Sequence, residues 1–324
     1  MRENEVGQKN IFIVFFKKIL PFIGLGIFFF LILNIGVHRV VSTFLSISPV
    51  YIVAAAILTL PRILIRNLAW QSILKQQKMR INFSSSLRIL LIGYFYATLT
   101  PGYMGHLMRM PYIKEEIDEP YGKLFVNTLI EIFVRNVSLF ILVFMGALFI
   151  LHYEPFVFYV TLLFILITFI IYWFFAKESR GVSFFNFIVR YLLPEKFKSK
   201  AALIINSFYK DFPDIRSLFF PFILGLFTWI IIFSQIYIIG LSLGIDVPYH
   251  VFLVVYPIAN IIGFIPITSS GFGTREAAVI FLFGLFGVSA DKALVLSVAG
   301  FLITDFLTGF YGFILSLSKV FQKK

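Results

Sequence analysis

Arginine is the residue type in this sequence best suited to chemistry, because several arginines fall inside strongly apolar stretches. Arg62 and Arg66 are four residues apart and directly follow Pro61. On a helix this spacing puts both guanidinium groups on one face, one turn apart. Two such groups suit an anion such as phosphate, which accepts paired N–H donors. In the alternative interpretation, Arg66 extends to the cytoplasmic membrane surface beside Trp70, as arginines near helix ends do.

Two further arginines, Arg109 and Arg275, each follow an interruption of an apolar segment. Residues 99–109 read LTPGYMGHLMR and residues 265–276 read IPITSSGFGTRE, so each runs from a proline through glycines to an arginine. The turn residues of the two interruptions are Pro101, Gly102, Gly105, Pro266, Gly271 and Gly273. Paired interruptions in two halves of a membrane protein indicate a substrate site. Unpaired backbone groups at membrane depth are tolerated only against protein or a water-filled cavity.

Each of these arginines is expected to lie at the start of a helix whose N-terminus points into the membrane. A helix N-terminus carries partial positive charge and free N–H groups, which bind anions. We therefore expect an anion site at Arg109 and Arg275. The alternative is a helix-capping role, in which Glu276 in the same first turn pairs with Arg275.

Three more charged residues lie within apolar segments, where each charge costs about 2.5–3.5 kcal/mol to insert and needs a partner or a role. Glu131 and Arg135 are four residues apart, which favours an internal ion pair, although both are also candidates for lining a cavity. Asp305 lies between Thr304 and Thr308 in the last apolar run. It is expected to be protonated, to couple protons, or, by default, to pair with an arginine.

The composition identifies the class of protein. The chain has 324 residues, of which 60% are hydrophobic, whereas soluble domains average about 45–50%. Several apolar runs reach the roughly 20 residues that cross a bilayer. The net charge of +12 comes from Lys and Arg beside these runs, so we expect contact with anionic lipid headgroups and not with nucleic acid. With no cysteine and four isolated histidines, we predict no metal site, no cofactor and no catalytic residue.

The pattern predicts an all-α polytopic membrane protein with one transmembrane domain over residues 1–324. Its halves are about 1–151 and 152–324, and an interfacial cytoplasmic loop occupies about 177–216. The six predicted crossings lie near residues 19–38, 50–74, 124–151, 155–176, 217–243 and 291–317. Positive charges flank alternate ends of these crossings, while the opposite loops offer only Arg39 and Lys292. By the positive-inside rule the chain spans the cytoplasmic membrane several times with both termini inside.

Segments 86–112 and 249–288 remain, and each contains one interruption. The topology makes the first a hairpin that enters and leaves from the cytoplasm and the second one that enters and leaves from outside. Re-entrant hairpins from opposite faces are the product of an inverted repeat. Either hairpin could instead be a pair of short crossings.

Several motifs resemble one membrane protein family. The run from Pro266 through GFGTREAA (271–278) to FGV (286–288) resembles the C-terminal signature of the lysylphosphatidylglycerol synthase transmembrane, or flippase-like, family. Arg66-x-x-x-Trp70 and the stretch 101–109 are similar to its N-terminal half, so the resemblance covers nearly the whole chain. The family's usual Glu-Arg pair appears here as Glu131-Ile132, with an arginine at Arg135. The turn after Pro266 is longer than usual by residues 268–270.

The resemblance implies an integral membrane domain that moves a lipid between leaflets. Some relatives carry a fused soluble domain that aminoacylates phosphatidylglycerol, and we expect no such domain and no synthase activity here. Other relatives are associated with polyprenyl-linked glycan pathways. The leading hypothesis is a translocase for an anionic phospholipid, aminoacyl-phospholipid or polyprenyl-phosphate-linked lipid. The alternative is a non-catalytic partner that presents a lipid to a separate transferase.

Overall fold

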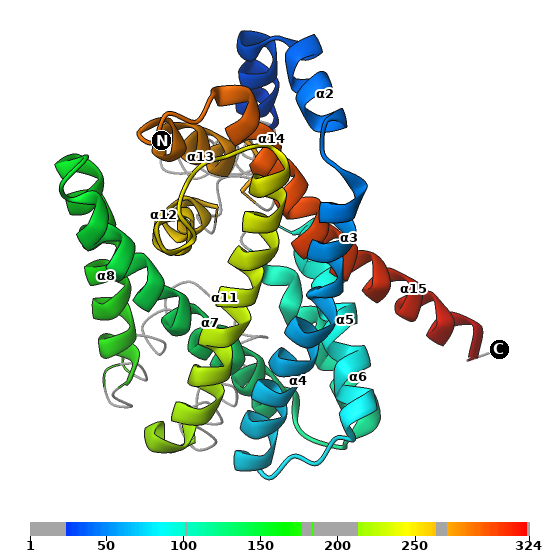
Figure 1. The fold of residues 1–324 in the computed structure, drawn as a ribbon. Coiled ribbons are helices and arrows are strands. Elements are labelled where there is room, and N and C mark those ends of the chain that lie inside the picture. The colour runs from blue at the N-terminus through cyan, green and yellow to red at the C-terminus, as the bar shows by residue number, and fades with distance from the viewer. Residues whose placement is uncertain are drawn as a thin grey trace, which may run out of the picture.

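The computed structural model describes residues 24–100, 103–176, 180, 183, 213–263 and 271–322, and within them every regular element is helical (Figure 1). The predicted all-α fold is therefore confirmed. Pro101, Gly102, Pro266 and most of the predicted interfacial loop at 177–216 lie outside the described residues.

Four helical spans are long and apolar enough to cross a membrane, and they agree closely with predicted crossings. The spans are Pro49–Gln76, Tyr121–Ile150, Arg216–Ser242 and Ala290–Leu317. They comprise α3 (Pro49–Ile57) with α4 (Thr59–Gln76), α7 (Tyr121–Ile150), η2 (Ile215–Leu218) with α11 (Phe219–Ser242), and α14 (Ala290–Phe301), η3 (Leu302–Phe306) and α15 (Leu307–Gln322). The predicted crossings at 50–74, 124–151, 217–243 and 291–317 each coincide with one of them.

The other two predicted crossings take different forms. Helix α8 (Pro155–Ala176) follows the predicted range 155–176, and its apolar part Pro155–Ile170 is shorter than the four long spans. The helix Gly24–Ile35 does not continue to residue 38 as predicted, because it meets α2 (Val37–Leu45) at 90°. Gly36 lies at the bend with φ of 102°, a conformation that glycine adopts without steric cost.

Both predicted interruptions divide a segment into two helices that pack on each other. The first is α5 (Phe83–Leu99), η1 (Met104–Met108) and α6 (Arg109–Glu116), and the second is α12 (Tyr249–Ile262) and α13 (Thr274–Gly284). In Figure 1, α12 and α13 lie near the upper end of α11, and α6 lies near the lower end of α4. The hairpins thus lie toward opposite ends of the bundle.

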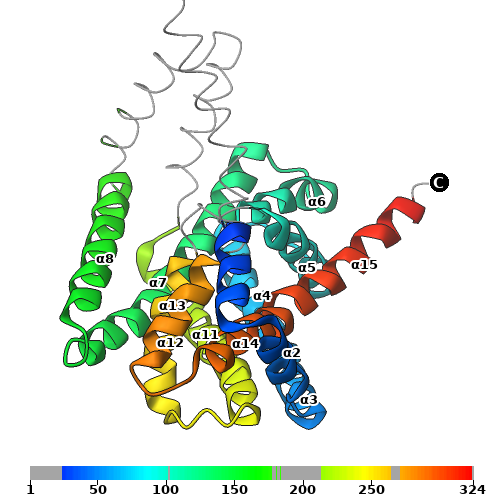
Figure 2. The same ribbon diagram turned by 90° about the horizontal axis from the view of Figure 1, so that it is seen from above.

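The helices of the two halves pack in a reciprocal pattern. Helix α5 packs along α15, which ends the second half, and α12 packs along α7, which ends the first half; Figure 2 shows both pairs. Helix α4 packs along α11, its counterpart before the other hairpin. Exchanging the halves therefore preserves these main contacts between helices.

A small apolar core fixes the first hairpin against α4. Trp70 and Leu74 of α4 pack with Ile89 and Leu90 of α5 and with Ile113 of α6, and all five side chains are buried. This core brings the polar side chains of α4, α6 and α7 together at one level of the bundle.

Candidate anion-binding site

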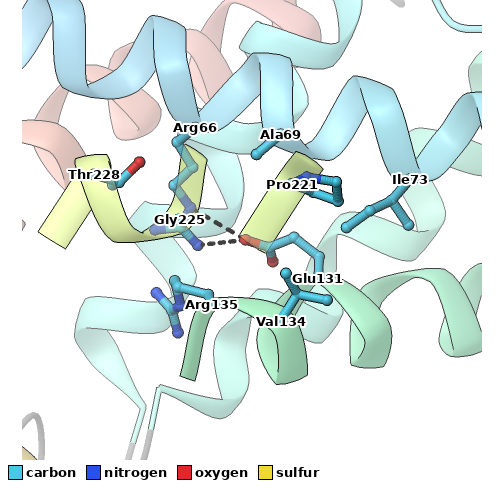
Figure 3. A pocket seen from close by; sticks show the side chains of 9 residues that line it. All are labelled: Arg66, Ala69, Ile73, Glu131, Val134, Arg135, Pro221, Gly225 and Thr228. Carbon is cyan, nitrogen blue, oxygen red and sulfur yellow. Dashed lines mark hydrogen bonds and ion pairs between the residues drawn. The ribbon is translucent and has the colours of Figure 1, made fainter. Parts of the chain in front are cut away.

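The carboxylate of Glu131 on α7 lies between two buried arginines. Arg66 on α4 donates to Oε1 of Glu131 from Nε at 3.2 Å and from Nη2 at 3.0 Å (Figure 3). Arg109, the first residue of α6, donates from Nη2 to Oε2 at 2.7 Å. All three side chains are at most 5% exposed. One carboxylate thus joins α4, α6 and α7 at membrane depth.

Aromatic rings and backbone groups orient the two arginines. Arg66 donates from Nη1 to the hydroxyl of Tyr94, and its guanidinium carbon lies 4.3 Å from the centre of the Tyr94 ring. Arg109 donates from Nε to the carbonyl of His106 at 3.1 Å and lies 4.9 Å over the ring of Trp70. Cation–π contacts of this kind are strongest where water is excluded. They hold both guanidinium groups on Glu131.

Gly93 provides the space for one of these arginines. A Cβ atom at this position would lie 2.5 Å from Cγ of Arg109 and 2.6 Å from its Cδ. A larger residue on α5 would therefore displace the Arg109 side chain from Glu131.

Arg135, one turn after Glu131 on α7, does not form the predicted ion pair with it. Glu131 is paired with Arg66 and Arg109 instead. The guanidinium carbon of Arg135 lies 5.9 Å from the centre of the Trp229 ring, and its buried Nε has no hydrogen-bond partner. The i,i+4 spacing predicted the wrong partner because two arginines from other helices reach the same carboxylate.

A small pocket opens beside this cluster between α4, α7 and α11. Figure 3 shows the side chains that line it: Arg66, Ala69, Ile73, Glu131, Val134, Arg135, Pro221, Gly225 and Thr228. Its volume is about 20 Å³, which is room for about one water molecule. A lipid phosphate requires the helices around it to separate.

The cluster carries more positive than negative charge. Arg66, Arg109 and Arg135 surround one carboxylate, so their formal charges sum to +2 when Glu131 is ionised. Nη1 of Arg109 and Nε of Arg135 are buried without a hydrogen-bond partner. Buried charged donors are costly when unpaired, and an anion in the pocket would supply a negative charge and an acceptor beside Arg135, which lines it.

Arg62 lies one turn before Arg66 but contacts a different part of the protein. Its Nη2 donates to the carbonyl oxygen of Thr304 at 2.7 Å and to the hydroxyl of Thr308 at 2.5 Å, both in the last crossing. The two arginines therefore do not form one clamp in this conformation. Arg62 joins α4 to the last crossing, while Arg66 joins α4 to α7.

Asp305 is half-buried beside this contact. Its Oδ2 accepts a hydrogen bond from the hydroxyl of Thr304 at 3.1 Å. No ion pair joins it to an arginine within the described part of the chain, so the expected pairing is absent. Arg62 binds the adjacent backbone carbonyl instead.

At the second interruption, Arg275 and Glu276 neutralise each other. Arg275 donates from Nη2 to Oε1 of Glu276 at 2.7 Å, and the backbone N–H of Gly273 donates to Oε2 at 2.6 Å. The hydroxyl of Ser297 on α14 donates to Glu276 at 2.9 Å and accepts from Nε of Arg275 at 3.0 Å. These contacts are the capping arrangement that the sequence offered as the alternative to an anion site.

The described turn residues of the interruptions serve close packing and unusual backbone geometry. Gly105 lies directly against the backbone carbonyl of Tyr96, where a Cβ atom has no space. Gly271 and Gly273 have φ of 74° and 84°, which favours glycine. As predicted, a helix begins at Arg109 and another begins at Thr274, one residue before Arg275.

The structure therefore sorts the predicted residues into three groups. Arg66, Arg109, Glu131 and Arg135 lie together, Arg275 and Glu276 form a second cluster, and Arg62 with Asp305 lies between α4 and the last crossing. Sequence reasoning missed Tyr94, His106 and Ser297 as members of these clusters. His106 is fully buried, and neither of its ring nitrogens is hydrogen-bonded. Its position inside the first interruption was the sequence feature that could have identified it as a member of the cluster.

Comparison with known proteins gives consistent matches over nearly the whole chain. Residues 15–312 match the family described as "Lysylphosphatidylglycerol synthase TM region". A "UPF0104 membrane protein" of Methanocaldococcus jannaschii is 24% identical over 298 residues, covering 87% of this chain and 89% of that protein. A "UPF0104 membrane protein" of Methanothermobacter thermautotrophicus is 22% identical over 276 residues, covering 80% of each.

Proposed function

The chain belongs to the lysylphosphatidylglycerol synthase TM region family, and we propose that it is a lipid translocase without catalytic activity of its own. Its cargo is an anionic phospholipid, an aminoacyl-phospholipid or a polyprenyl-phosphate-linked lipid. The phosphate enters between the helices while the hydrocarbon chains stay in the bilayer. The protein acts in the cytoplasmic membrane, with both termini on the cytoplasmic side.

The surplus positive charge around Glu131 carries this proposal. Charged residues inside a membrane are rare and mark pathways for substrates or ions. Here Arg66 and Arg109 bind one carboxylate and Arg135 lies one turn away on α7, and Arg109 and Arg135 keep buried N–H groups without acceptors. An arginine fork matches the oxygen geometry of a phosphate group. The cluster is therefore suited to a phosphate-bearing lipid.

Glu131 is the internal counter-anion of the site. It holds Arg66 and Arg109 in place and prevents two unpaired charges from being buried together. A phosphate that enters the pocket beside Glu131 meets Arg66 and Arg135, the two arginines that line it. Because the pocket holds about one water, entry must be coupled to a separation of α4, α7 and α11. That coupling lets the site open to one side at a time.

The reciprocal packing of the halves supports alternating access. Each hairpin packs on the last crossing of the other half, α5 on α15 and α12 on α7. We infer an inverted repeat in which one half rocks against the other around the arginine cluster. The glycines of the interruptions permit the close backbone approach that the hairpins need in either state.

A liposome assay tests the proposal. The purified chain is reconstituted with a fluorescent phosphatidylglycerol, and a membrane-impermeant quencher reports which leaflet holds the label. We expect faster loss of protected label than in empty liposomes. Arg135→Gln, which removes one charge from the pocket, should abolish most of the gain. Arg80→Gln removes the same charge at an exposed position and should not.

Three lipid classes are assayed in this way: phosphatidylglycerol, its lysyl ester and a polyprenyl phosphate. No acceleration for any of them would overturn the translocase proposal. Binding of one of them without movement would favour the alternative, in which the chain presents the lipid to a separate transferase.

A further inference from the structure

The last crossing is irregular at its centre, around a carboxylate that the arginine cluster does not use. Residues Leu302–Phe306 form a π-helix between α14 and α15. Short π-helical turns inside α-helices occur frequently at functional sites. Asp305 lies in this turn, 15 residues after Ala290 and 12 before Leu317 within the span. It is therefore about 18–22 Å from either end of the helix, near the middle of the membrane.

Asp305 is not neutralised by a direct ion pair within the described residues. Its side chain accepts one hydrogen bond, from the hydroxyl of Thr304, and it is half-buried. An acidic side chain at this depth normally faces a partner or a water-filled cavity and is part of an ion pathway. The carboxylate therefore has one hydrogen-bond donor and no direct counter-charge among the described residues.

The charged and titratable groups around Asp305 are the ones that can respond to its charge. Arg62 of α4, Tyr256 of α12 and Tyr103 of the first interruption interact with it electrostatically. Of the helices packed on the π-helix, α3 and α11 contain no Asp, Glu, Lys or Arg, only Tyr51 and Tyr237. The remaining groups are Arg88, Tyr94 and Tyr96 on α5, Asp291 and Lys292 on α14, and Tyr311 and Lys319 on α15.

Three of these groups already have partners. Arg88 pairs with Glu116, Asp291 with Arg39, and Tyr94 accepts from Arg66. Among the described residues, Arg62 carries a positive charge that interacts with Asp305; its Nη2 is bound to Thr304 and Thr308, and its Nε has no partner. A change in the charge of Asp305 is therefore felt first by Arg62.

Arg62 links this carboxylate to the anion cluster. Arg62 and Arg66 lie one turn apart on α4, and Arg66 binds Glu131. A negative Asp305 attracts Arg62 and adds negative charge to the network. A protonated Asp305 does neither, so the network then favours an added anion. By linkage, an anion bound at the cluster favours proton uptake by the same factor.

We propose that Asp305 is a proton-coupling site, at which one proton binds as the lipid phosphate enters the arginine cluster and leaves on the other side with it. On the entry side one O–H bond forms on the carboxylate as one O–H bond of a hydronium ion breaks and leaves water. On the exit side the carboxyl O–H bond breaks and the proton passes to water, which becomes hydronium, with no other reactant. The inference rests on the proposed translocase function, which it deepens by naming the coupling ion.

The first test measures lipid movement under a proton gradient. Reconstituted vesicles carry the label in one leaflet, with either the labelled side or the opposite side more acidic. We expect movement away from the acidic side to be about fivefold or more faster than toward it, and a protonophore should remove the difference. In Asp305→Asn the ratio of the two rates should fall to one. Asp246→Asn, an exposed acid outside the helices, should keep the wild-type ratio.

The second test separates this inference from the translocase proposal because it measures binding alone. A pH indicator dye records proton uptake when phosphatidylglycerol is added to the detergent-purified chain in weakly buffered solution. We expect uptake by wild type and by Asp246→Asn, and none by Asp305→Asn. Lipid movement with equal rates in both gradients, or lipid binding without proton uptake, would overturn the coupling site and leave the translocase standing. An absence of lipid movement in vesicles without a gradient would instead count against the translocase.

Discussion

The two interruptions look alike in sequence, yet the arginines that follow them have different partners. Arg109 shares Glu131 with Arg66 and keeps a buried N–H group without an acceptor. Arg275 shares Glu276 with Ser297 and Gly273, and the two opposite charges cancel. The first interruption therefore contributes to a site with charge to spare, and the second forms a capped turn. Similar sequence patterns can thus place an arginine in a cluster with surplus positive charge in one case and in a neutral ion pair in the other.

The largest expected effect is on the carboxylate that holds the charged cluster together. Glu131→Gln leaves Arg66 and Arg109 buried without a negative partner, which should lower the free energy of unfolding by about 3–5 kcal/mol. Thermal unfolding in detergent measures the change. Glu116→Gln, which breaks the more exposed pair with Arg88, should cost at most about 1 kcal/mol. Equal stability of the two variants would show that Glu131 is not the centre of this cluster.

The next effect tests the backbone geometry of the turn in the second interruption. Gly273 has φ of 84°, and a Cβ atom there would meet the carbonyl oxygen of Gly24. Gly273→Ala should therefore lower the free energy of unfolding by about 2–4 kcal/mol, from overpacking together with backbone strain. Gly105→Ala should cost less, about 1–3 kcal/mol, because it meets the carbonyl of Tyr96 without a positive φ.

The control for both glycine variants is a third glycine, in the helix that contains Arg275. Gly284, the last residue of α13, has nothing within 4 Å of an added Cβ atom. Gly284→Ala should be neutral or stabilise the protein by up to about 1 kcal/mol. A loss of stability at Gly284 as large as at Gly273 would show that α13 tolerates no change, and that the backbone geometry of the turn is not the cause of the loss at Gly273.

The third effect is on lipid binding and compares the cluster around Glu131 with the second interruption. Arg135→Gln removes a charged donor from the pocket, and such a hydrogen bond contributes about 1.5–3 kcal/mol. The affinity for phosphatidylglycerol should fall about 10- to 100-fold, measured by titration in detergent. Arg275→Gln should leave this affinity within about threefold, because the Arg275 charge is already neutralised by Glu276. Similar losses in both variants would show that Arg275 belongs to the same anion site as Arg135.

The sequence predicts the crossings well because their signal is local. Apolar runs long enough to cross a bilayer gave four spans whose ends agree with the structure to within a few residues. The helix-capping role of Glu276 could also be predicted, because an acidic residue in the first turn of a helix is a local sequence pattern. The bend at Gly36 was missed because apolar residues continue on both sides of it.

The partners inside the site could not be predicted, because they come from distant parts of the chain. Glu131 lies 65 residues from Arg66 and 22 from Arg109. The spacing of four residues to Arg135 was the only local candidate for a partner, and it was wrong. Likewise, nothing near Asp305 in sequence indicates that Arg62, 242 residues from Thr304, binds the neighbouring carbonyl. Only tertiary packing decides which of several buried arginines a carboxylate receives.

The smallest expected effect concerns the hydroxyl that joins the second interruption to α14. Ser297→Ala removes one hydrogen bond to Glu276 and one from Arg275, but the ion pair between these residues remains. We expect the free energy of unfolding to fall by about 1 kcal/mol and the affinity for phosphatidylglycerol to stay unchanged. Ser316→Ala, at a hydroxyl bonded only to the carbonyl of Phe313, is the matched control and should stay within about 0.5 kcal/mol of wild type. If Ser297→Ala weakened lipid binding as much as Arg135→Gln, the second interruption would be part of the anion site. Both interruptions would then contribute to lipid binding, and the contrast between Arg109 and Arg275 would hold only for this conformation.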